Sequence, residues 1–537
     1  MNKRNNNTYE HNRIGVMTVI IAYLVFRILI TGKLGMQGSA YLFTAVDILV
    51  MMLIMVPFAV KHSVSRLCRI KLKNGQSGNA LRVLYGGLIV IIIYSILATV
   101  LLLILKKPIC RLFLFGKNSY KIYMWLLPCI FVIGMIDYFK GFLLGIRDHA
   151  SYIFVTLFHI IAMLISSLIF ISIYEKKGMV VSEVLYNREL IFAYSATGGA
   201  LGIFLGSVLT LILCIIFYYF KKNIILQGSS KHTDDIYDVL GWIKLDILKN
   251  AIPLITLFIC NIGIQTVFFE GNGEFPREVT TYQWGAYAGP FFNIMLLPFL
   301  ILFAYSFMCK HDLKAGLRGN SISELRVKVE DMYHEAILIG IPFASFIAFN
   351  AKPILEGINK MNFDFGISYV RMAAPAVILL CLVVVSTNIL AGLGQYFVCF
   401  FNCGIAAIFS IVVDVLCVNS FKLGMSSSVI ALYLFGLSAT ILNYLSVKKT
   451  IKFTPEVLLF TIRPLIVSVV AGFVTFLIGL LLSMFMPAWS ICLVLSVIYL
   501  IIVFVALVKL SVINSYTLSG SLIGGLFMIL GKTFNIL

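Results

Sequence analysis

The feature that most constrains this chain is a series of long apolar runs. Fourteen stretches of its 537 residues are long and apolar enough to cross a bilayer as helices. A hydrocarbon core about 30 Å thick requires about 20 apolar residues per helix, and every backbone group within it must be paired internally. The runs are rich in Leu, Ile and Phe and do not alternate with polar residues, which indicates helices rather than the strands of an outer-membrane barrel. They cover approximately residues 14–31, 41–60, 84–105, 122–143, 151–173, 191–219, 250–269, 283–307, 334–350, 367–392, 397–418, 425–447, 458–483 and 489–508.

The composition excludes several classes of protein. With 61% hydrophobic and only 12% charged residues, the chain is not an ordinary soluble protein. Its net charge of +19 would suggest nucleic acid in a soluble chain, but here the charge is distributed among membrane loops, so nucleic acid is not an expected partner. The eleven cysteines form no CxxC pair and the histidines have no ligand spacing. We therefore predict no metal, no cofactor and no enzymatic centre.

The distribution of Lys and Arg predicts the topology. With the N-terminus inside, 25 of the 42 cations fall in cytoplasmic segments and 14 in outer segments. The positive-inside rule then predicts that both termini are cytoplasmic. Five outward-facing cations within residues 106–121 depart from the rule, and snorkelling to lipid phosphates accounts for them. The remaining three cations, Arg27, Lys140 and Arg463, lie inside apolar runs.

The sequence also repeats itself at an interval of six runs. Pro128 is followed by Gly145 in the fourth run, and Pro375 by Gly392 in the tenth, both 17 residues apart. Two dipeptides recur in the same way: Pro57-Phe58 as Pro298-Phe299, and Lys221-Lys222 as Lys448-Lys449. Because six is even, the repeats predict two bundles of like orientation, related by a pseudo-two-fold axis along the membrane normal, with a cleft between them.

This repeat predicts the domain organisation. We expect an all-α polytopic membrane protein of about 14 transmembrane helices, built from two parallel six-helix bundles and two C-terminal helices. The predicted parts are an N-terminal bundle (1–222), a cytoplasmic amphipathic linker (223–249), a C-terminal bundle (250–449), two added helices (450–510) and a membrane-associated cytoplasmic tail (511–537).

Five segments carry a resemblance to a known family. They are GKLGMQGSAYLFTAVDILVMMLIMVPFAVKHSVSRL (32–67), the two Pro-x16-Gly segments, ATGGALGIFLGSVL (196–209) and GPFFNIMLLPFLILFAYS (289–306). The chain resembles the multidrug/oligosaccharidyl-lipid/polysaccharide exporter superfamily, and within it the polysaccharide-biosynthesis and stage V sporulation protein B branch, relatives of the lipid II flippase. The resemblance implies a bacterial cell-membrane transporter that moves an undecaprenyl-linked sugar intermediate from the inner to the outer leaflet.

Arg27 and Asp47 are the first candidate substrate-binding residues. Ionisable groups within hydrocarbon are costly and usually face a cavity or a partner. In antiparallel neighbouring helices both residues lie in the outer half, so they could pair. A guanidinium there suits pyrophosphate oxygens, with Asp47 holding or releasing Arg27. The alternative is a buried pair that only fastens the first two runs.

The seventh and eighth runs supply the other candidates for substrate binding, Asn261, Gln265, Tyr287 and Asn293. The resembled flippases often place arginines in these helices, and none occurs here. Amides and aromatic rings suit sugar hydroxyls and pyranose faces, so this set favours a sugar-rich headgroup. Interhelical hydrogen bonds and an interfacial aromatic belt are the alternative explanation.

Three further charges are candidates for gating or ion coupling. Asp137 and Lys140 are three residues apart and can pair along one helix face, while Asp414 is a carboxylate expected inside a bundle. A purely structural role stays open for each. The glycines of the sixth run, Gly198, Gly199, Gly202 and Gly206, are spaced for close helix packing.

The cytoplasmic segments 62–83 and 234–248 are amphipathic, and we expect them to lie on the inner leaflet among membrane lipids. A docking surface for a cytoplasmic glycan-synthesis enzyme is an alternative.

The sequence thus favours a flippase for a lipid-linked glycan precursor. Two rival functions are an ion-coupled multidrug exporter, which would depend on Asp47 or Asp414, and a membrane glycosyltransferase or polymerase, for which no large outer loop is present.

Overall fold

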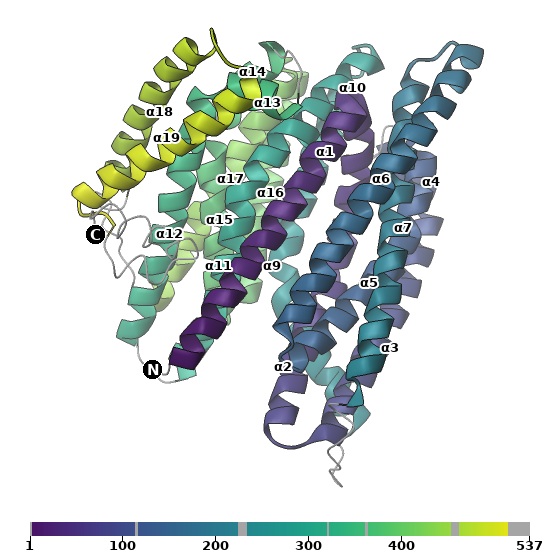
Figure 1. Ribbon diagram of the computed structural model, residues 1–537, viewed down its shortest axis with the longest axis vertical. Helices are drawn as coiled ribbons and strands as arrows, with labels where there is room; N and C mark the ends of the chain where they lie inside the picture. The colour runs from purple at the N-terminus through teal and green to yellow at the C-terminus, as the bar shows by residue number, and fades with distance from the viewer. Residues whose placement is uncertain are drawn as a thin grey trace. The chain divides into compact units, whose positions relative to one another are not determined.

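The computed structural model describes residues 3–112, 116–223, 234–318, 322–359, 364–452 and 461–513. Its helices are drawn in Figure 1. The first half contains α1 (Lys3–Met55), α2 (Pro57–Lys73), α3 (Ser77–Ile104), α4 (Lys106–Leu112), the 3₁₀ turn η1 (Gly116–Ser119), α5 (Tyr120–Gly145), α6 (His149–Leu185) and α7 (Glu189–Lys221). The second half contains α9 (Ile236–Gly271), α10 (Arg277–Ala286), the π-helical η2 (Tyr287–Phe291), α11 (Phe292–Arg318), α12 (Ile322–Phe349), α13 (Ala351–Asn359), α14 (Asp364–Ala373), α15 (Ala376–Gly392), α16 (Tyr396–Asn419), α17 (Met425–Ile451), α18 (Arg463–Leu482) and α19 (Ala488–Lys509).

Membrane-spanning helices dominate this architecture. Among the described residues, eleven helices are long and apolar enough to cross a membrane, or twelve if the bent pair α14 and α15 is counted as one span. The first of them, Gly15–Lys73, has 59 residues. A straight helix of that length would extend about 88 Å, far beyond one bilayer core. It contains the predicted run 41–60 and all but the first residue of the run 14–31, and α9 contains the run 250–269. The prediction of an all-α polytopic membrane fold is confirmed.

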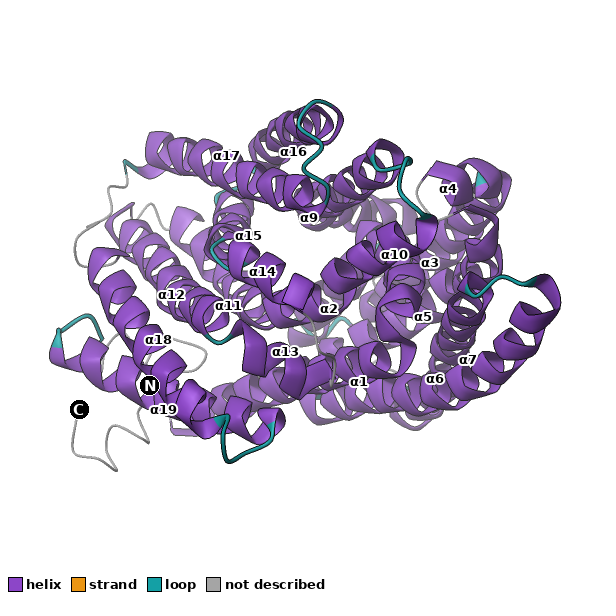
Figure 2. Ribbon diagram, turned by 90° about the horizontal axis from the view of Figure 1, so that it is seen from above, coloured by secondary structure: helices purple, strands orange, loops and turns teal. Residues whose placement is uncertain are grey.

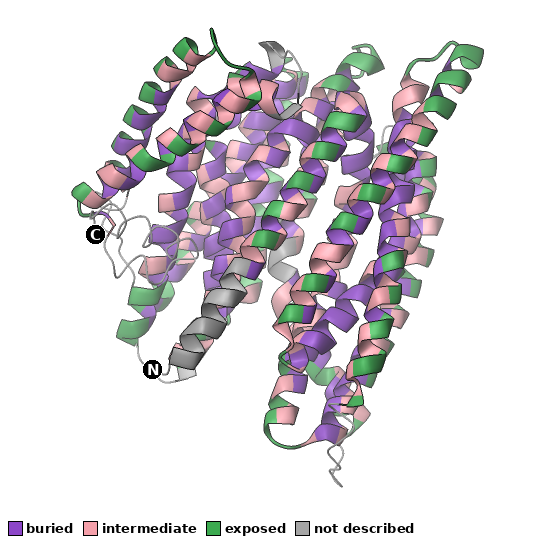
Figure 3. Cartoon of the chain, in the orientation of Figure 1, coloured by how far each residue is buried: buried purple, intermediate pink, exposed green. Residues whose placement is uncertain are grey.

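The faces of α16 show what the helices are built to contact. Its buried face carries Cys399, Cys403, Ser410 and Asp414. Its exposed face carries large apolar side chains: Phe401, Ile405, Ile408, Phe409 and Val412. A helix of a water-soluble protein has the opposite pattern, with its polar residues outward. Figure 3 shows how exposed and buried positions follow opposite faces of single helices. Apolar exposed faces of this extent are the surfaces that contact lipid.

The chain divides into two compact units. Unit 1 comprises residues 1–20, 267–272 and 290–537, and unit 2 comprises residues 21–266 and 273–289. The domain boundaries expected from the repeat, at 222 and 449, stay predictions. Residues 224–233 of the predicted linker and residues 514–537 of the predicted tail lie outside the described part of the chain.

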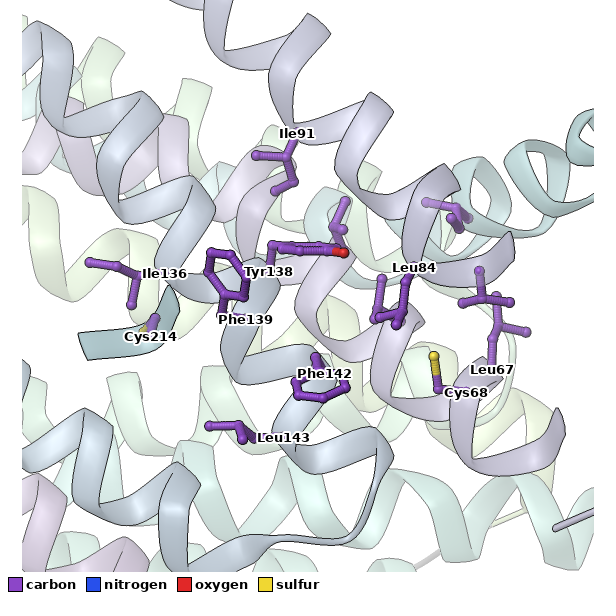
Figure 4. Close-up of a cluster of buried hydrophobic side chains, with 14 of the residues drawn as sticks. Leu67, Cys68, Leu84, Ile91, Ile136, Tyr138, Phe139, Phe142, Leu143 and Cys214 are labelled. Carbon is purple, nitrogen blue, oxygen red and sulfur yellow. The ribbon is translucent and has the colours of Figure 1, made fainter. Parts of the chain in front are cut away.

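Unit 2 is organised around an apolar cluster shared by α2, α3, α5 and α7. Figure 4 shows Leu84, Tyr138, Phe142 and Cys68 directed into this cluster. The helices α6 and α7 lie side by side along their lengths, as Figures 1 and 2 both show.

Glycines allow that close packing of α6 and α7. A methyl group built on Gly202 would lie 2.2 Å from Cα of Ser167, and one on Gly206 would lie 2.6 Å from Cα of Met163. A side chain at either position would overlap the backbone of α6. The packing role expected for the glycines of the sixth run is therefore confirmed at these two positions.

The first turns of α9 differ from the expectation for this segment. Its apolar residues Val239 and Ile243 are fully buried in the cluster of α2 and α3, instead of lying on lipid. An ion pair and a hydrogen bond stabilise the same contact: Arg66 of α2 lies 2.6 Å from the Asp246 carboxylate, and Ser63 donates to that carboxylate at 3.1 Å. A helix that packs on protein and a helix that lies on lipid have the same spacing of apolar residues. The periodicity of this segment therefore does not distinguish the two environments.

In unit 1, the C-terminal helices α18 and α19 pack on α12. The Tyr499 hydroxyl donates to the Pro342 carbonyl at 2.9 Å, and Ser345 donates to the Ser468 carbonyl at 2.7 Å. The proline repeat has different consequences in the two units. Pro128 lies inside the continuous helix α5, whereas Pro375 stands at a 45° bend between α14 and α15.

Candidate functional site

The first helix folds back on itself at Gly35. This residue has φ 67° and ψ −172°, a conformation that glycine adopts without steric cost. The guanidinium carbon of Arg27 lies 3.8 Å from the centre of the Phe43 ring. Sixteen residues of straight helix would separate these residues by about 24 Å. The two arms of α1, before and after Gly35, therefore form an antiparallel hairpin, as expected for the first two runs.

Arg27 is enclosed at the centre of this hairpin, with only 3% of its surface exposed. Its guanidinium stacks on Phe43 and donates a hydrogen bond of 2.9 Å to the Ala288 carbonyl. Ala288 belongs to the π-helical stretch η2, where the regular helical hydrogen bonding is interrupted and Pro290 lacks a donor. In such an irregular stretch, backbone carbonyls are free to accept hydrogen bonds from side chains, and the Ala288 carbonyl accepts one from Arg27.

Asp47 of the second arm takes part in a chain of hydrogen bonds. The Asn261 amide of α9 donates to its carboxylate at 3.0 Å, and the Tyr287 hydroxyl donates to the Asn261 carbonyl oxygen at 3.3 Å. Arg27 is close enough to attract the Asp47 carboxylate electrostatically. The carboxylate thus accepts an amide hydrogen bond within the field of a buried cation.

The helix α10 is fastened to the same hairpin. A methyl group built on Gly285 would lie 2.0 Å from the Met36 carbonyl oxygen, so only glycine allows this backbone contact. Beside it, the Trp284 indole donates to the Thr44 hydroxyl at 3.2 Å, and its ring lies 4.8 Å from that of Tyr287. These contacts place an indole and a phenol beside the arm of α1 that carries Thr44 and Asp47.

Four of the predicted substrate-binding residues come together here: Arg27, Asp47, Asn261 and Tyr287. Gln265 is buried four residues further along α9, while Asn293 is buried in α11 and belongs to unit 1. Sequence reasoning missed Phe43 and Thr44. Arg27 and Phe43 are each eight residues from Gly35, and a hairpin brings such positions together. The sequence identifies this contact only once the turn has been placed at Gly35.

The candidate gating residues lie elsewhere. Asp137 forms its ion pair with Lys61 of α2, at 3.4 Å, rather than with Lys140 one turn away on α5. The expected pairing along one helix face is therefore replaced by a pairing between helices. Asp414 of α16 is fully buried, and neither carboxylate oxygen has a hydrogen-bond partner among the described residues. Among those residues, no group of three or more metal-ligating side chains is present.

Comparisons with solved structures identify this arrangement of helices. The chain aligns with an inward-facing multidrug resistance MATE family transporter of the MOP superfamily with a TM-score of 0.65, 14% identity, and coverage of 82% of this chain and 98% of the transporter. An outward-facing MATE structure aligns with a TM-score of 0.60 and 14% identity, covering 82% of this chain and 96% of the other.

A lipid II flippase, MurJ in an inward closed conformation, aligns with a TM-score of 0.60 and 14% identity, over 92% of this chain and 97% of the flippase. No protein-family model matches the sequence, and no curated protein matches it. The similarity therefore concerns the fold, which this chain shares with the MATE transporters and the MurJ flippase of the MOP superfamily.

Proposed function

We propose that this protein is a membrane transporter that flips an undecaprenyl-linked glycan precursor from the inner to the outer leaflet of a bacterial cell membrane. The observation that carries the proposal is the buried Arg27, which stacks on Phe43 and attracts the Asp47 carboxylate. Asp47 in turn accepts a hydrogen bond from Asn261, which accepts one from Tyr287. An ionisable side chain at such a depth marks a substrate or ion pathway by default.

The chemistry of this set fits a sugar attached to a phosphate. The planar fork of a guanidinium binds phosphate oxygens in pairs, while amide, phenol and indole groups bind hydroxyls and the faces of sugar rings. A single arginine among amides and aromatic rings favours a headgroup rich in neutral sugars over one with many anionic groups.

In this proposal, the hydrogen bonds described above belong to a closed state of the site, in which no substrate is bound. Arg27 donates to the Ala288 carbonyl, and Asp47 accepts from Asn261, so both charged groups have protein partners. Substrate binding would exchange these partners for phosphate oxygens and sugar hydroxyls. This exchange requires the α1 hairpin to separate from η2 and α9, which is one step of an alternating-access cycle.

The proposal is tested in proteoliposomes that contain the full chain and an undecaprenyl-pyrophosphate-linked fluorescent sugar. The fraction of label that an impermeant quencher reaches is measured against time. Wild-type protein is expected to accelerate transfer, and Arg27→Ala to reduce that acceleration about tenfold to a hundredfold while the variant remains folded. Equal transfer with and without wild-type protein would contradict the proposed function.

A second candidate function is an ion-coupled multidrug exporter, and Asp414 favours it. A buried carboxylate without a hydrogen-bond donor either takes up a proton or binds a cation. Such a group can couple an ion gradient to transport in a flippase or in an exporter. In the same proteoliposomes, efflux of a cationic dye driven by a sodium or proton gradient, lost in Asp414→Asn and unaffected by undecaprenyl-linked sugar, would favour the exporter.

The cytoplasmic side carries two further proposals. The cation distribution supports cytoplasmic termini. The linker helix α9 and its contact helix α2 are proposed as the surface on which a cytoplasmic glycan-synthesis enzyme docks, with membrane lipids as the surrounding partner. Crosslinking from a photoreactive residue at the exposed position Lys244 in cells tests this docking.

A further inference from the structure

A second group of buried charges lies in unit 2, on α2 and α5. Lys61 of α2 pairs with Asp137 of α5 at 3.4 Å, and their side chains are only 12% and 13% exposed. Gly141 makes this contact between helices possible, because a methyl group on it would lie 2.9 Å from the Lys61 carbonyl oxygen. Lys61 also lies 4.8 Å from the centre of the Phe58 ring. The ion pair is thus built into the packing of two helices.

Lys140 lies one turn further along α5 and is 6% exposed. It forms no hydrogen bond and no ion pair with any residue in the described part of the chain, and its nearest opposite charge is Asp137, which already holds Lys61. Two cations therefore share one carboxylate. When Lys140 is protonated, one positive charge is left uncompensated within a membrane-spanning bundle, where an unpaired charge costs several kcal/mol.

Among the described residues around the cluster, no other side chain supplies the missing negative charge. His159 of α6 faces Lys140 and is already bonded to the Ser207 hydroxyl at 3.0 Å. Cys214 of α7 and Tyr152 of α6 are the remaining titratable groups that face the lysines, and neither is a carboxylate. From all four helices packed here, Asp137 is the one carboxylate that the described residues bring to the lysines.

We propose that this cluster is a binding site for a small inorganic monovalent anion, such as chloride, held by Lys140 beside the Lys61 and Asp137 pair. The single uncompensated positive charge of Lys140 is neutralised by a single negative charge, which is why the anion is monovalent. The surroundings are tight, because Tyr138, Phe142 and Cys214 are buried in the adjoining apolar cluster and the backbone of Lys61 touches Gly141. A small ion fits such a space better than a lipid headgroup, whose glycerol and acyl chains would have to enter the bundle.

This inference goes beyond the proposed function and is tested without measuring transport. The full chain, purified in a neutral detergent, is unfolded thermally in gluconate buffer with increasing chloride at constant ionic strength. Binding to the folded state raises the unfolding temperature in a saturable way. Equilibrium binding of radioactive chloride to the same samples gives the dissociation constant directly. A parallel titration with phosphatidylglycerol in chloride-free buffer separates a lipid phosphate from the free ion.

The expected results differ among variants. Lys140→Met is expected to abolish the saturable chloride effect and to unfold at a higher temperature than wild type in gluconate, because it removes the uncompensated charge. Asp137→Asn is expected to bind chloride about tenfold more tightly, because it removes the competing carboxylate. Lys176→Met, at an exposed position of α6, is the matched control and is expected to titrate like wild type.

The proposal is overturned by any of three outcomes. Wild-type protein shows no saturable chloride dependence, Lys140→Met retains the wild-type dependence, or phosphatidylglycerol replaces chloride as the stabilising ligand. If Lys140→Met does not fold, the opposite shift expected for Asp137→Asn still decides the question, because a site without a bound anion would not gain affinity in that variant.

Discussion

The guanidinium of Arg27 and the ring of Phe43 lie 3.8 Å apart, although sixteen residues of helix separate them in sequence. This contact encloses a permanent charge between an aromatic face and the Ala288 carbonyl, in a hairpin that turns at Gly35. The charge is positioned before any substrate arrives. Such preorganisation reduces the entropy that binding must otherwise overcome.

Replacing Arg27 is expected to impair transport more than stability. Arg27→Ala removes the guanidinium proposed to bind phosphate, and the loss of such a charge-assisted contact, worth about 1.5–3 kcal/mol, should reduce the flipping rate about tenfold to a hundredfold. Arg27→Lys keeps the charge but loses the planar fork, so it should recover only part of the rate. Arg463→Ala is the control, because Arg463 also donates to a carbonyl, that of Leu510 at 3.0 Å, at an exposed position. Equal loss in both alanine variants would refute a special role for Arg27.

Removing the Asn261 amide is expected to destabilise the closed site. Asn261→Ala takes from Asp47 the amide donor it has at 3.0 Å, and a buried acceptor that loses its donor costs about 1–3 kcal/mol. Asn261→Ala, Asp47→Asn and the double variant form a thermodynamic cycle, measured by thermal unfolding in detergent. A coupling energy near zero between the two positions would show that the hydrogen bond does not contribute.

The close packing of α6 on α7 should not tolerate a methyl group. Gly202→Ala places Cβ 2.2 Å from Cα of Ser167, so the helices must separate, at a cost of about 1–3 kcal/mol or more. Gly404→Ala in α16 is the matched control, because no heavy atom lies within 4 Å of a methyl group there. Thermal unfolding of both variants should show a clear decrease for the first and little change for the second.

The attachment of α9 to α2 should depend on Asp246. Asp246→Ala removes the carboxylate that Arg66 and Ser63 contact, at 2.6 and 3.1 Å. Because the Arg66 side chain is partly exposed to solvent, the expected loss is only about 1 kcal/mol and should shrink as salt increases. Limited proteolysis within the first turns of α9 at low and high salt measures the release of this helix. Cleavage that is equally fast in wild type and variant at low salt would contradict the prediction.

Much of the fold follows from the sequence, because a bilayer leaves few choices. Each apolar run had to form a helix, and the short segment between the first two runs implied an antiparallel pair with Arg27 and Asp47 both in its outer half. What the sequence could not provide was the identity of contacts between distant segments. The pattern around Asp137 shows the local neighbour Lys140, while its partner Lys61 lies 76 residues away. Likewise, Val239 and Ile243 have the spacing of a lipid-bound helix and are buried on protein.

The turn at Gly35 also has a consequence for biogenesis. An arginine near the middle of a single helix costs about 2.5–3.5 kcal/mol when that helix enters the membrane by itself. The ring that covers Arg27 lies on the very next segment to be synthesised. A helical hairpin that enters as one unit brings the charge and its aromatic cover into the membrane together. The first 55 residues are therefore expected to insert as a pair, with Phe43 acting on Arg27 before the rest of the chain has been made.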